Sequence, residues 1–407
     1  MRNTYKHSRI IFLYIAFIAV ILGACAQELS LTRPAVSLAV PQAAETRLAT
    51  IPEGYTVGEI VFSHDGQKVV YSAGRGGKEH VFFEGSRGTS YDKVKFLILS
   101  HDNRRIAYVA RSEGKEFIVV DGVEGKRYRA VDDPVFSPDS RVVAYGAEKD
   151  RKWHIVIGDK ESPGTDMLYM EPVFSADSSF VTSIEQDFTT GKSVRIVSST
   201  DMKQIKRGIE YDWIGSVAVS PDKARIAHGV RTENKRFVIV SDFTSVEDGE
   251  TGAPYDNVSH VTISPDGRRI AYFAVRGGHT FIVNGDRETR FTADDILFPP
   301  VFSPDGTKVA VGATRQGKGL IILDGKDGQL YDAVSRPVFS PDGSRMLYRA
   351  GKEGKWVTIL ADEEGRLIRE YLFDGVINPP VFSPDGKSII LGIRKGRELL
   401  WKVVPIE

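Results

Sequence analysis

Near-copies of one six-residue segment, Val-Phe-Ser-Pro-Asp-Gly at residues 338–343, occur nine times along this chain of 407 residues. The copies are marked by Ser63, Ser100, Ser137, Ser175, Ser220, Ser264, Ser303, Ser340 and Ser383. Successive serines are 37 to 45 residues apart. A period near 40 residues is typical of propeller blades and other stacked arrays. The chain is therefore built from repeats, and this period limits the folds open to it.

The recurring segment has the composition of a β-turn between two strands. Serine suits the first turn position, proline presets φ at the second, and glycine tolerates the positive φ at the exit. Some copies lose the proline, as at His101, or the glycine, as at Asn103, whereas serine and aspartate are present in all nine. We therefore predict that side-chain hydrogen bonds hold the turn and that all nine aspartates are structural.

Each repeat contains several short runs of β-branched and aromatic residues, which predict strands. Residues 105–110 and 117–120 illustrate a second and a third strand, followed by the hairpin dipeptide Asp121-Gly122. A Tyr-Asp-x-Val segment, as at Tyr331, is expected to supply a short fourth strand. Prolines such as Pro337 then open the next first strand, a position at which proline is tolerated. Four short strands per repeat without helical periodicity predict an all-β propeller.

The repeats resemble the TolB-like, WD-like propeller repeat, whose signature is the turn formed by a hydrophobic residue, Ser, Pro, Asp and Gly. The resemblance covers about Gly54 to Glu407 and implies the fold, but it leaves function open because such propellers serve both as scaffolds and as domains of hydrolases. We expect about nine four-stranded blades. The alternative is eight regular blades, if the Ser175 repeat packs irregularly.

The two ends of the array predict how the ring closes. The ninth repeat ends after a third strand at residues 399–404 and has no Tyr-Asp-x-Val segment. The segment Gly54-Tyr55-Thr56-Val57 precedes the first turn with nearly the spacing of that segment. We therefore expect an N-terminal strand to complete the last blade and remove two exposed sheet edges.

The N-terminus has the features of a secretion signal. Basic residues precede an uncharged run at residues 10–22, which is short for a membrane-spanning helix. Leu22 to Cys25 resembles the bacterial lipobox, which implies that Cys25 carries acyl chains and becomes the mature N-terminus, anchored in the membrane by its lipid. In that family, Ala26 after the cysteine suggests outer-membrane sorting.

We accordingly expect three regions: a lipoprotein signal peptide at 1–24, an acylated cysteine and flexible tether at 25–47, and a propeller at 48–407. The expected location is the bacterial cell envelope, at the outer membrane and facing the periplasm or the cell surface. The tether expectation rests on a composition of Ala, Ser, Pro, Thr and Gln without sustained periodicity.

Several patterns that suggest catalysis have simpler explanations. The Ser-His-Asp runs at 63–65 and 100–102 lie on turns, where neighbouring side chains diverge instead of converging as a triad. Cys25 is the only cysteine, and no histidine or acidic spacing matches a common metal site. First strands reading Val-Phe-Ser or Val-Thr-Ile offer no acid or base. We expect no catalytic residue, no metal and no cofactor.

One functional pattern survives, in the turn between the second and third strands. The repeated lysines are Lys78, Lys115, Lys152, Lys192, Lys235, Lys318 and Lys355, and the arginines just before such turns are Arg75, Arg111, Arg231, Arg276, Arg315 and Arg394. These groups are expected to form a basic face opposite the Ser-Pro-Asp-Gly turns. A plain solvated rim, partly neutralised by nearby acids such as Glu79 and Glu233, explains the same pattern.

The chain carries 54 basic and 54 acidic residues, so its overall charge says little about partners, and we expect no binding to nucleic acid. We expect a non-catalytic protein-binding or scaffolding module whose envelope partner is acidic. The alternatives are an envelope hydrolase or lyase with an active site at the axial mouth, and a binder of anionic glycan or lipid head groups.

Overall fold

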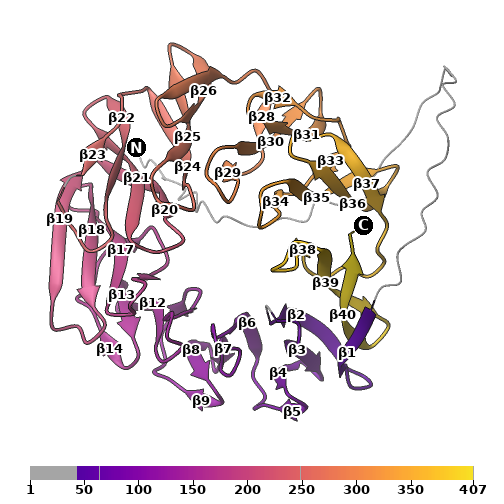
Figure 1. Ribbon diagram of the computed structural model, residues 1–407. Coiled ribbons are helices and arrows are strands. Elements are labelled where there is room, and N and C mark those ends of the chain that lie inside the picture. Colours follow the sequence, from indigo (N-terminus) through magenta and orange to yellow (C-terminus); the bar gives the residue numbers. More distant parts are fainter. Residues whose placement is uncertain (1–43, 64, 248, 407) are drawn as a thin grey trace, which may run out of the picture. The chain divides into compact units, whose positions relative to one another are not determined.

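A computed structural model describes residues 44–63, 65–247 and 249–406. Cys25, the predicted signal peptide and the tether as far as residue 43 lie outside the described residues. The described residues form strands and no helix, arranged as nine antiparallel sheets that follow one another around a ring (Figure 1). The fold is therefore a nine-bladed β-propeller, and the Ser175 repeat forms a complete blade. Within this part of the chain, no helix has the length and apolar character required to cross a bilayer.

Four blades have a continuous first strand. Blade 1 contains β2 (Thr56–Phe62), β3 (Val69–Arg75), β4 (Lys78–Phe83) and β5 (Ser86–Arg87). Blade 2 contains β6 (Lys93–Leu99), β7 (Ile106–Ser112), β8 (Lys115–Val120) and β9 (Val123–Glu124). Blade 5 contains β20 (Trp213–Val219), β21 (Arg225–Thr232), β22 (Lys235–Asp242) and β23 (Glu250–Thr251). Blade 6 contains β24 (Asn257–Ile263), β25 (Ile270–Arg276), β26 (His279–Asn284) and β27 (Arg287–Arg290).

In four further blades the first strand is split in two. Blade 3 contains β10 (Ala130–Val131), β11 (Val135–Phe136), β12 (Val143–Lys149), β13 (Lys152–Ile157) and β14 (Lys160–Glu161). Blade 4 contains β15 (Met167–Leu168), β16 (Val173–Phe174), β17 (Phe180–Asp187), β18 (Lys192–Ser199) and β19 (Ile205–Tyr211). Blade 7 contains β28 (Asp295–Ile296), β29 (Val301–Phe302), β30 (Val309–Arg315), β31 (Lys318–Leu323) and β32 (Lys326–Asp327). Blade 8 contains β33 (Ala333–Val334), β34 (Val338–Phe339), β35 (Arg345–Lys352), β36 (Lys355–Asp362) and β37 (Leu367–Tyr371).

The predicted prolines explain the split strands. Pro134, Pro172, Pro300 and Pro337 each stand directly before the second half of a first strand. Proline has no N–H to donate and cannot continue the ladder. In blade 3, for example, pairing ends at Val131 and resumes at Val135, directly after Pro134. The blades without this proline keep one strand but contain a bulge.

The repeated turn forms as predicted. In all nine copies the serine hydroxyl donates to the aspartate Oδ1, at 2.5 to 2.6 Å, and the fourth turn residue has positive φ. In the copy at Ser340, the serine Oγ also accepts the amide of Arg345 at 2.9 Å, and Asp342 accepts the amide of Ser344. These bonds close the hairpin between first and second strands, so the aspartates have the predicted structural role.

The prediction for the Tyr-Asp-x-Val segment was wrong in one respect. The fourth strand lies earlier, directly after the hairpin dipeptide, as β9 follows Asp121-Gly122. Tyr128 instead bridges back to Glu116 on the third strand, and the residues after it enter the next blade. The segment is a crossover between blades because its tyrosine pairs with one sheet and its following residues pair with another.

The ring closes through the N-terminal strand, but not through the predicted residues. Blade 9 consists of β38 (Val381–Phe382), β39 (Ser388–Lys395), β40 (Glu398–Pro405) and β1 (Ala44–Thr50). Figure 1 shows the indigo β1 beside the yellow β40, with which it pairs antiparallel. Residues 44–47, which were expected to lie in the tether, thus belong to the propeller, and Thr56 and Val57 belong to blade 1.

The apolar core lies between neighbouring sheets. The cluster that includes Val81, Tyr91 and Tyr108 joins blades 1 and 2. Where the ring closes, Ile51 is buried against Tyr71 of blade 1 and Leu399 of blade 9. Each blade therefore buries its faces against its neighbours, which explains why a repeat array forms one large unit.

Candidate binding face

The turns between second and third strands leave each blade at the end opposite the Ser-Asp turns, because consecutive strands run antiparallel. All seven predicted lysines occupy one structural position, the first residue of a third strand, in β4, β8, β13, β18, β22, β31 and β36. The sequence therefore placed these lysines on one face correctly. Whether that face binds a partner depends on which charges are free.

Five of the seven lysines are paired with aspartates of the crossover segments. The pairs and their Nζ–Oδ1 distances are Lys78–Asp92 at 2.6 Å, Lys152–Asp166 at 2.5 Å, Lys192–Asp212 at 2.5 Å, Lys235–Asp256 at 3.0 Å and Lys318–Asp332 at 3.0 Å. Much of the predicted basic ring is thus matched by an acidic ring that the sequence analysis did not identify. The Asp of the Tyr-Asp dipeptide was the available signal for four of the five, and Asp166 follows Thr165 instead.

The same aspartates also join neighbouring blades. Asp92 binds Lys78 of blade 1 through Oδ1, while its Oδ2 accepts the amide of Glu113 in blade 2 at 3.1 Å. Asp166, Asp212 and Asp256 make equivalent bonds to the following blade. The lysine hydrogen bond is the largest cause that holds the pKa of these four carboxyls below its ordinary value. We call this arrangement the Lys-Asp clip.

The predicted arginines have mostly local partners. Arg276 pairs with Glu288 and Arg315 with Asp327, both on fourth strands of their own blades. Arg75 lies over the ring of Tyr55, with 5.8 Å from the guanidinium carbon to the ring centroid. Arg231 donates to the backbone carbonyl of Asp212, and Arg394 donates to the backbone carbonyl of Gly396. Arg111 lies near Asp92, and its positive charge lowers the pKa of the Asp92 carboxyl.

The clip is absent at the two other lysines. At Lys115, Arg129 occupies the aspartate position of the crossover and pairs with Glu148 at 2.6 Å. At Lys355, the crossover does contain Asp374. Among the described residues, neither Lys115 nor Lys355 has a carboxylate within 4.0 Å, and Asp374 has no cationic partner.

A basic and aromatic surface surrounds Lys355, where blade 8 meets blade 9. Trp356 is 44% exposed, and the guanidinium carbon of Arg349 lies 5.2 Å from its ring centroid. On the neighbouring strand β37, the guanidinium carbon of Arg369 lies 5.9 Å from the ring centroid of Tyr371. Arg349 and Arg369 also lack an ion pair among the described residues. We call Arg349, Lys355, Trp356 and Arg369 the 8/9 patch.

The sequence analysis missed a group of carboxylates on the first strands. Asp132 and Asp133 lie between β10 and β11, and Glu171 lies between β15 and β16. Burial raises the pKa of Asp132 to about 6, with a further contribution from the negative charge of Asp133. The two consecutive aspartates before Pro134 were visible in the sequence, but only the residues after the prolines were considered. In the described ranges, no three His, Cys, Asp or Glu side chains are grouped to hold a metal ion.

No protein-family model matches the chain, and no curated protein matches it. Among solved structures, a eukaryotic initiation factor aligns with a TM-score of 0.51 at 12% identity, over 81% of this chain and 90% of that one. TolB from Acinetobacter baumannii aligns with a TM-score of 0.34 at 20% identity, over 56% of this chain and 64% of that one. An oligogalacturonate lyase in complex with manganese aligns with a TM-score of 0.42 at 14% identity, over 91% of this chain and 95% of that one. Identities this low support the propeller fold alone.

Proposed function

We propose that this propeller is a non-catalytic scaffold that captures an acidic protein partner on the 8/9 patch. The observation that carries the proposal is the exposed Trp356 among three cations that have no carboxylate within ion-pair distance. In five other blades the repeated lysine of this face is held by an aspartate, so its charge is already balanced. The broken clip thus concentrates free positive charge at one junction.

The residue types of the patch suit protein recognition. Tryptophan, tyrosine and arginine are the residues that most often dominate interface energies. Arg349 and Arg369 already lie over aromatic rings, which holds their guanidinium groups in place before a partner arrives. A partner segment that carries carboxylates beside an apolar side chain would complete the missing ion pairs and cover Trp356.

The test compares partner capture by the wild-type chain and by single variants. Trp356→Ala and Lys355→Glu should each weaken binding by roughly tenfold or more, and the effect of Lys355→Glu should be larger at low salt. Lys115→Glu is the matched control, because Lys115 is also unpaired and occupies the same repeat position in blade 2. Equal capture by all four proteins would contradict the proposal.

We also propose that the chain is a lipoprotein of the bacterial envelope. The support is in the sequence: the basic residues before residue 10, the uncharged run at 10–22, and Cys25 after Leu-Gly-Ala. Cys25→Ala should abolish both incorporation of a labelled fatty acid and partition into membranes. An unlabelled wild-type chain would contradict the anchor and the outer-membrane location that depends on it.

A second candidate function, hydrolase or lyase activity, is favoured by Asp132. A half-buried carboxyl with a pKa of about 6 is suited to general acid or base catalysis near neutral pH. The nearby Asp133 and Glu171 also carry raised pKa values, mainly through burial. Turnover of an ester or a glycan by the wild type, lost in Asp132→Asn with folding retained, would support an enzyme over a scaffold.

A further inference from the structure

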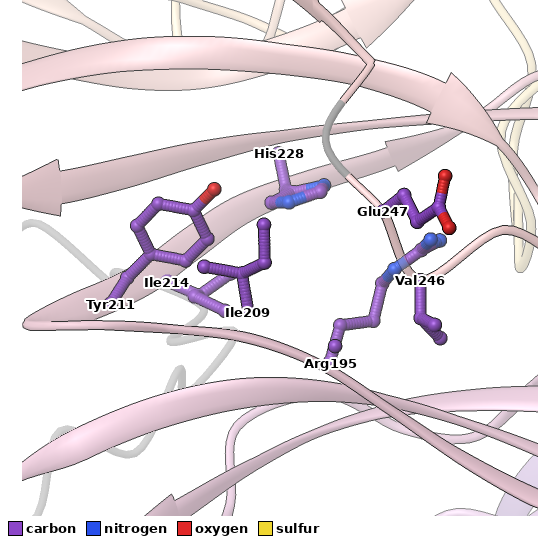
Figure 2. Close-up of a pocket in the computed structure, with 8 residues that line it drawn as sticks. Arg195, Ile209, Tyr211, Ile214, His228, Val246 and Glu247 are labelled. Carbon is purple, nitrogen blue, oxygen red and sulfur yellow. The ribbon is translucent and has the colours of Figure 1, made fainter.

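A small pocket lies between blades 4 and 5, where the sequence pattern gave no sign of a site. Its lining includes Arg195 of β18, Gly208 of β19, His228 of β21 and Glu247 of the segment after β22. Figure 2 shows Arg195, His228 and Glu247 among the residues that line the pocket, with the guanidinium end of Arg195 on the side of Val246 and Glu247. The cavity volume is about 10 Å³, close to the minimum that holds a single water-sized particle.

Arg195 is a buried cation that forms no ion pair among the described residues. Its residue is 3% exposed, and none of the described residues places a carboxylate within 4.0 Å of it. The bond that Arg195 does make runs from Nη1 to the carbonyl of Phe243 at 3.4 Å, and Nη2 is buried without an acceptor. Burial lowers the pKa of Arg195 only to about 10, so the guanidinium is charged at neutral pH. A buried, unpaired charge is strongly destabilising unless something compensates it.

His228 supplies a second unused polar atom at the same pocket. The residue is 5% exposed, and its Nδ1 is buried without a hydrogen-bond partner. Burial, with the positive charge of Arg195 as a smaller cause, lowers the pKa of His228 to about 3, so the ring is neutral at physiological pH. A neutral imidazole with its proton on Nδ1 is a donor. In that tautomer the pocket presents two donors beside the positive charge of Arg195.

The local backbone creates this space. Opposite Arg195 the ladder between β18 and β19 contains a bulge, so that Val194 pairs with Glu210 and Ile196 pairs with Arg207. Gly208 in the bulge permits the close approach of the segment after β22, because a Cβ there would lie 3.0 Å from the carbonyl oxygen of Val246. The pocket is thus formed by a defined irregularity of blade 4.

We propose that this pocket binds one halide-sized monovalent anion between Arg195 Nη2 and His228 Nδ1. Among the described residues the buried guanidinium has no carboxylate partner, and its Nη2 can donate to an anion, as can Nδ1 of the imidazole tautomer that is protonated there. The small volume suits a halide-sized ion. Glu247 is the competing source of negative charge, since it lines the pocket, but its side chain is exposed and lies beyond ion-pair distance of Arg195. The bound anion fastens the segment after β22 to blade 4.

The direct test is a crystal of the wild-type chain grown with bromide in place of chloride. The proposal predicts one anomalous peak in contact with Arg195 Nη2 and His228 Nδ1. A water without anomalous signal at that position, or the carboxylate of Glu247 turned into the pocket, would overturn it. This measurement needs no variant and therefore does not depend on whether Arg195 can be replaced.

Thermal unfolding gives an independent test in solution. At equal ionic strength, the wild type should melt about 2 °C higher in ~0.2 M chloride than in gluconate, which is too large for the pocket. The difference should vanish in Arg195→Met and persist in Glu247→Gln and in Arg207→Met, a control at an exposed arginine paired with Glu210. Loss of the chloride effect in Glu247→Gln, or equal melting of the wild type in both salts, would contradict anion binding.

Discussion

At the scale of single residues, a serine and an aspartate two positions apart set the geometry of this protein. Besides the nine predicted turns, a tenth copy occurs at Ser199 and Asp201, where Ser199 Oγ donates to Asp201 at 2.7 Å and Met202 has positive φ. The sequence analysis missed it because it joins third and fourth strands and lacks both proline and glycine. The hydrogen bonds, and not the proline, therefore define the motif.

The serine hydroxyl should contribute measurably to stability, because it is buried and both donates and accepts. Ser340→Ala removes the bond to Asp342 and leaves the amide of Arg345 without its hydroxyl acceptor. We expect a loss of about 1 to 2 kcal/mol in the free energy of unfolding, measured in urea. Ser344→Ala, which removes an exposed hydroxyl bound to the same aspartate, should cost less, and an equal cost would contradict this role.

The carboxyls predict two opposite effects of pH on stability. Hydrogen bonds, chiefly from the serine hydroxyls, lower the pKa of Asp305 and of Asp342 to about 2. The stability that these carboxylates give the fold is therefore complete above their ordinary pKa of 3.8 and is lost as the pH falls toward 2. The pKa of Asp132 is raised to about 6, so stability should decrease as pH rises from about 4 to about 6. Asp132→Asn should remove that decrease in urea unfolding measured across this range. A decline of the same size in Asp132→Asn would contradict the assignment.

At the scale of strands, the number of repeats, the turn and the closure of the ring could be predicted from the sequence. The prediction was wrong about which N-terminal segment supplies the last strand of blade 9. Tyr55 to Val57 resembles the crossover motif and was expected to complete blade 9. The structure uses β1 for that purpose, while Thr56 and Val57 pair with β3 of blade 1. The carboxylates at Asp132 and Asp133 escaped prediction because their pKa depends on burial between blades, which local sequence does not reveal.

Removal of β1 should destabilise the ring. A chain that begins at Ile51 leaves the edge of β40 unpaired and removes Leu48 and Ala49 from the cluster around Ile51. We expect a lower melting temperature and aggregation on heating, measured by calorimetry and light scattering. A chain that begins at Ala44 is the control and should melt like a longer one. Equal melting of the two truncated chains would contradict closure through β1.

At the scale of the whole molecule, a position where one blade differs from the repeated pattern indicates where a specific function can lie. Five lysines of one face pair with crossover aspartates, and four of these aspartates also bind the next blade, so most of the lysines in the basic ring predicted from sequence have a structural partner. The clip fails at the junction of blades 8 and 9, where Trp356 is exposed among unpaired cations. The 8/9 patch thus differs from the equivalent surfaces of the blades with paired lysines, and we expect the protein to bind its partner there.

The most direct test of this account is photo-crosslinking in living cells with a photoreactive amino acid at position 356, compared with position 153. Both positions are tryptophans at the second residue of a third strand, but Trp153 follows a lysine held by Asp166. We predict a discrete crosslinked protein from position 356 and none from position 153. The absence of an adduct at 356, or the same adduct from both positions, would contradict the claim that the 8/9 patch is the binding surface.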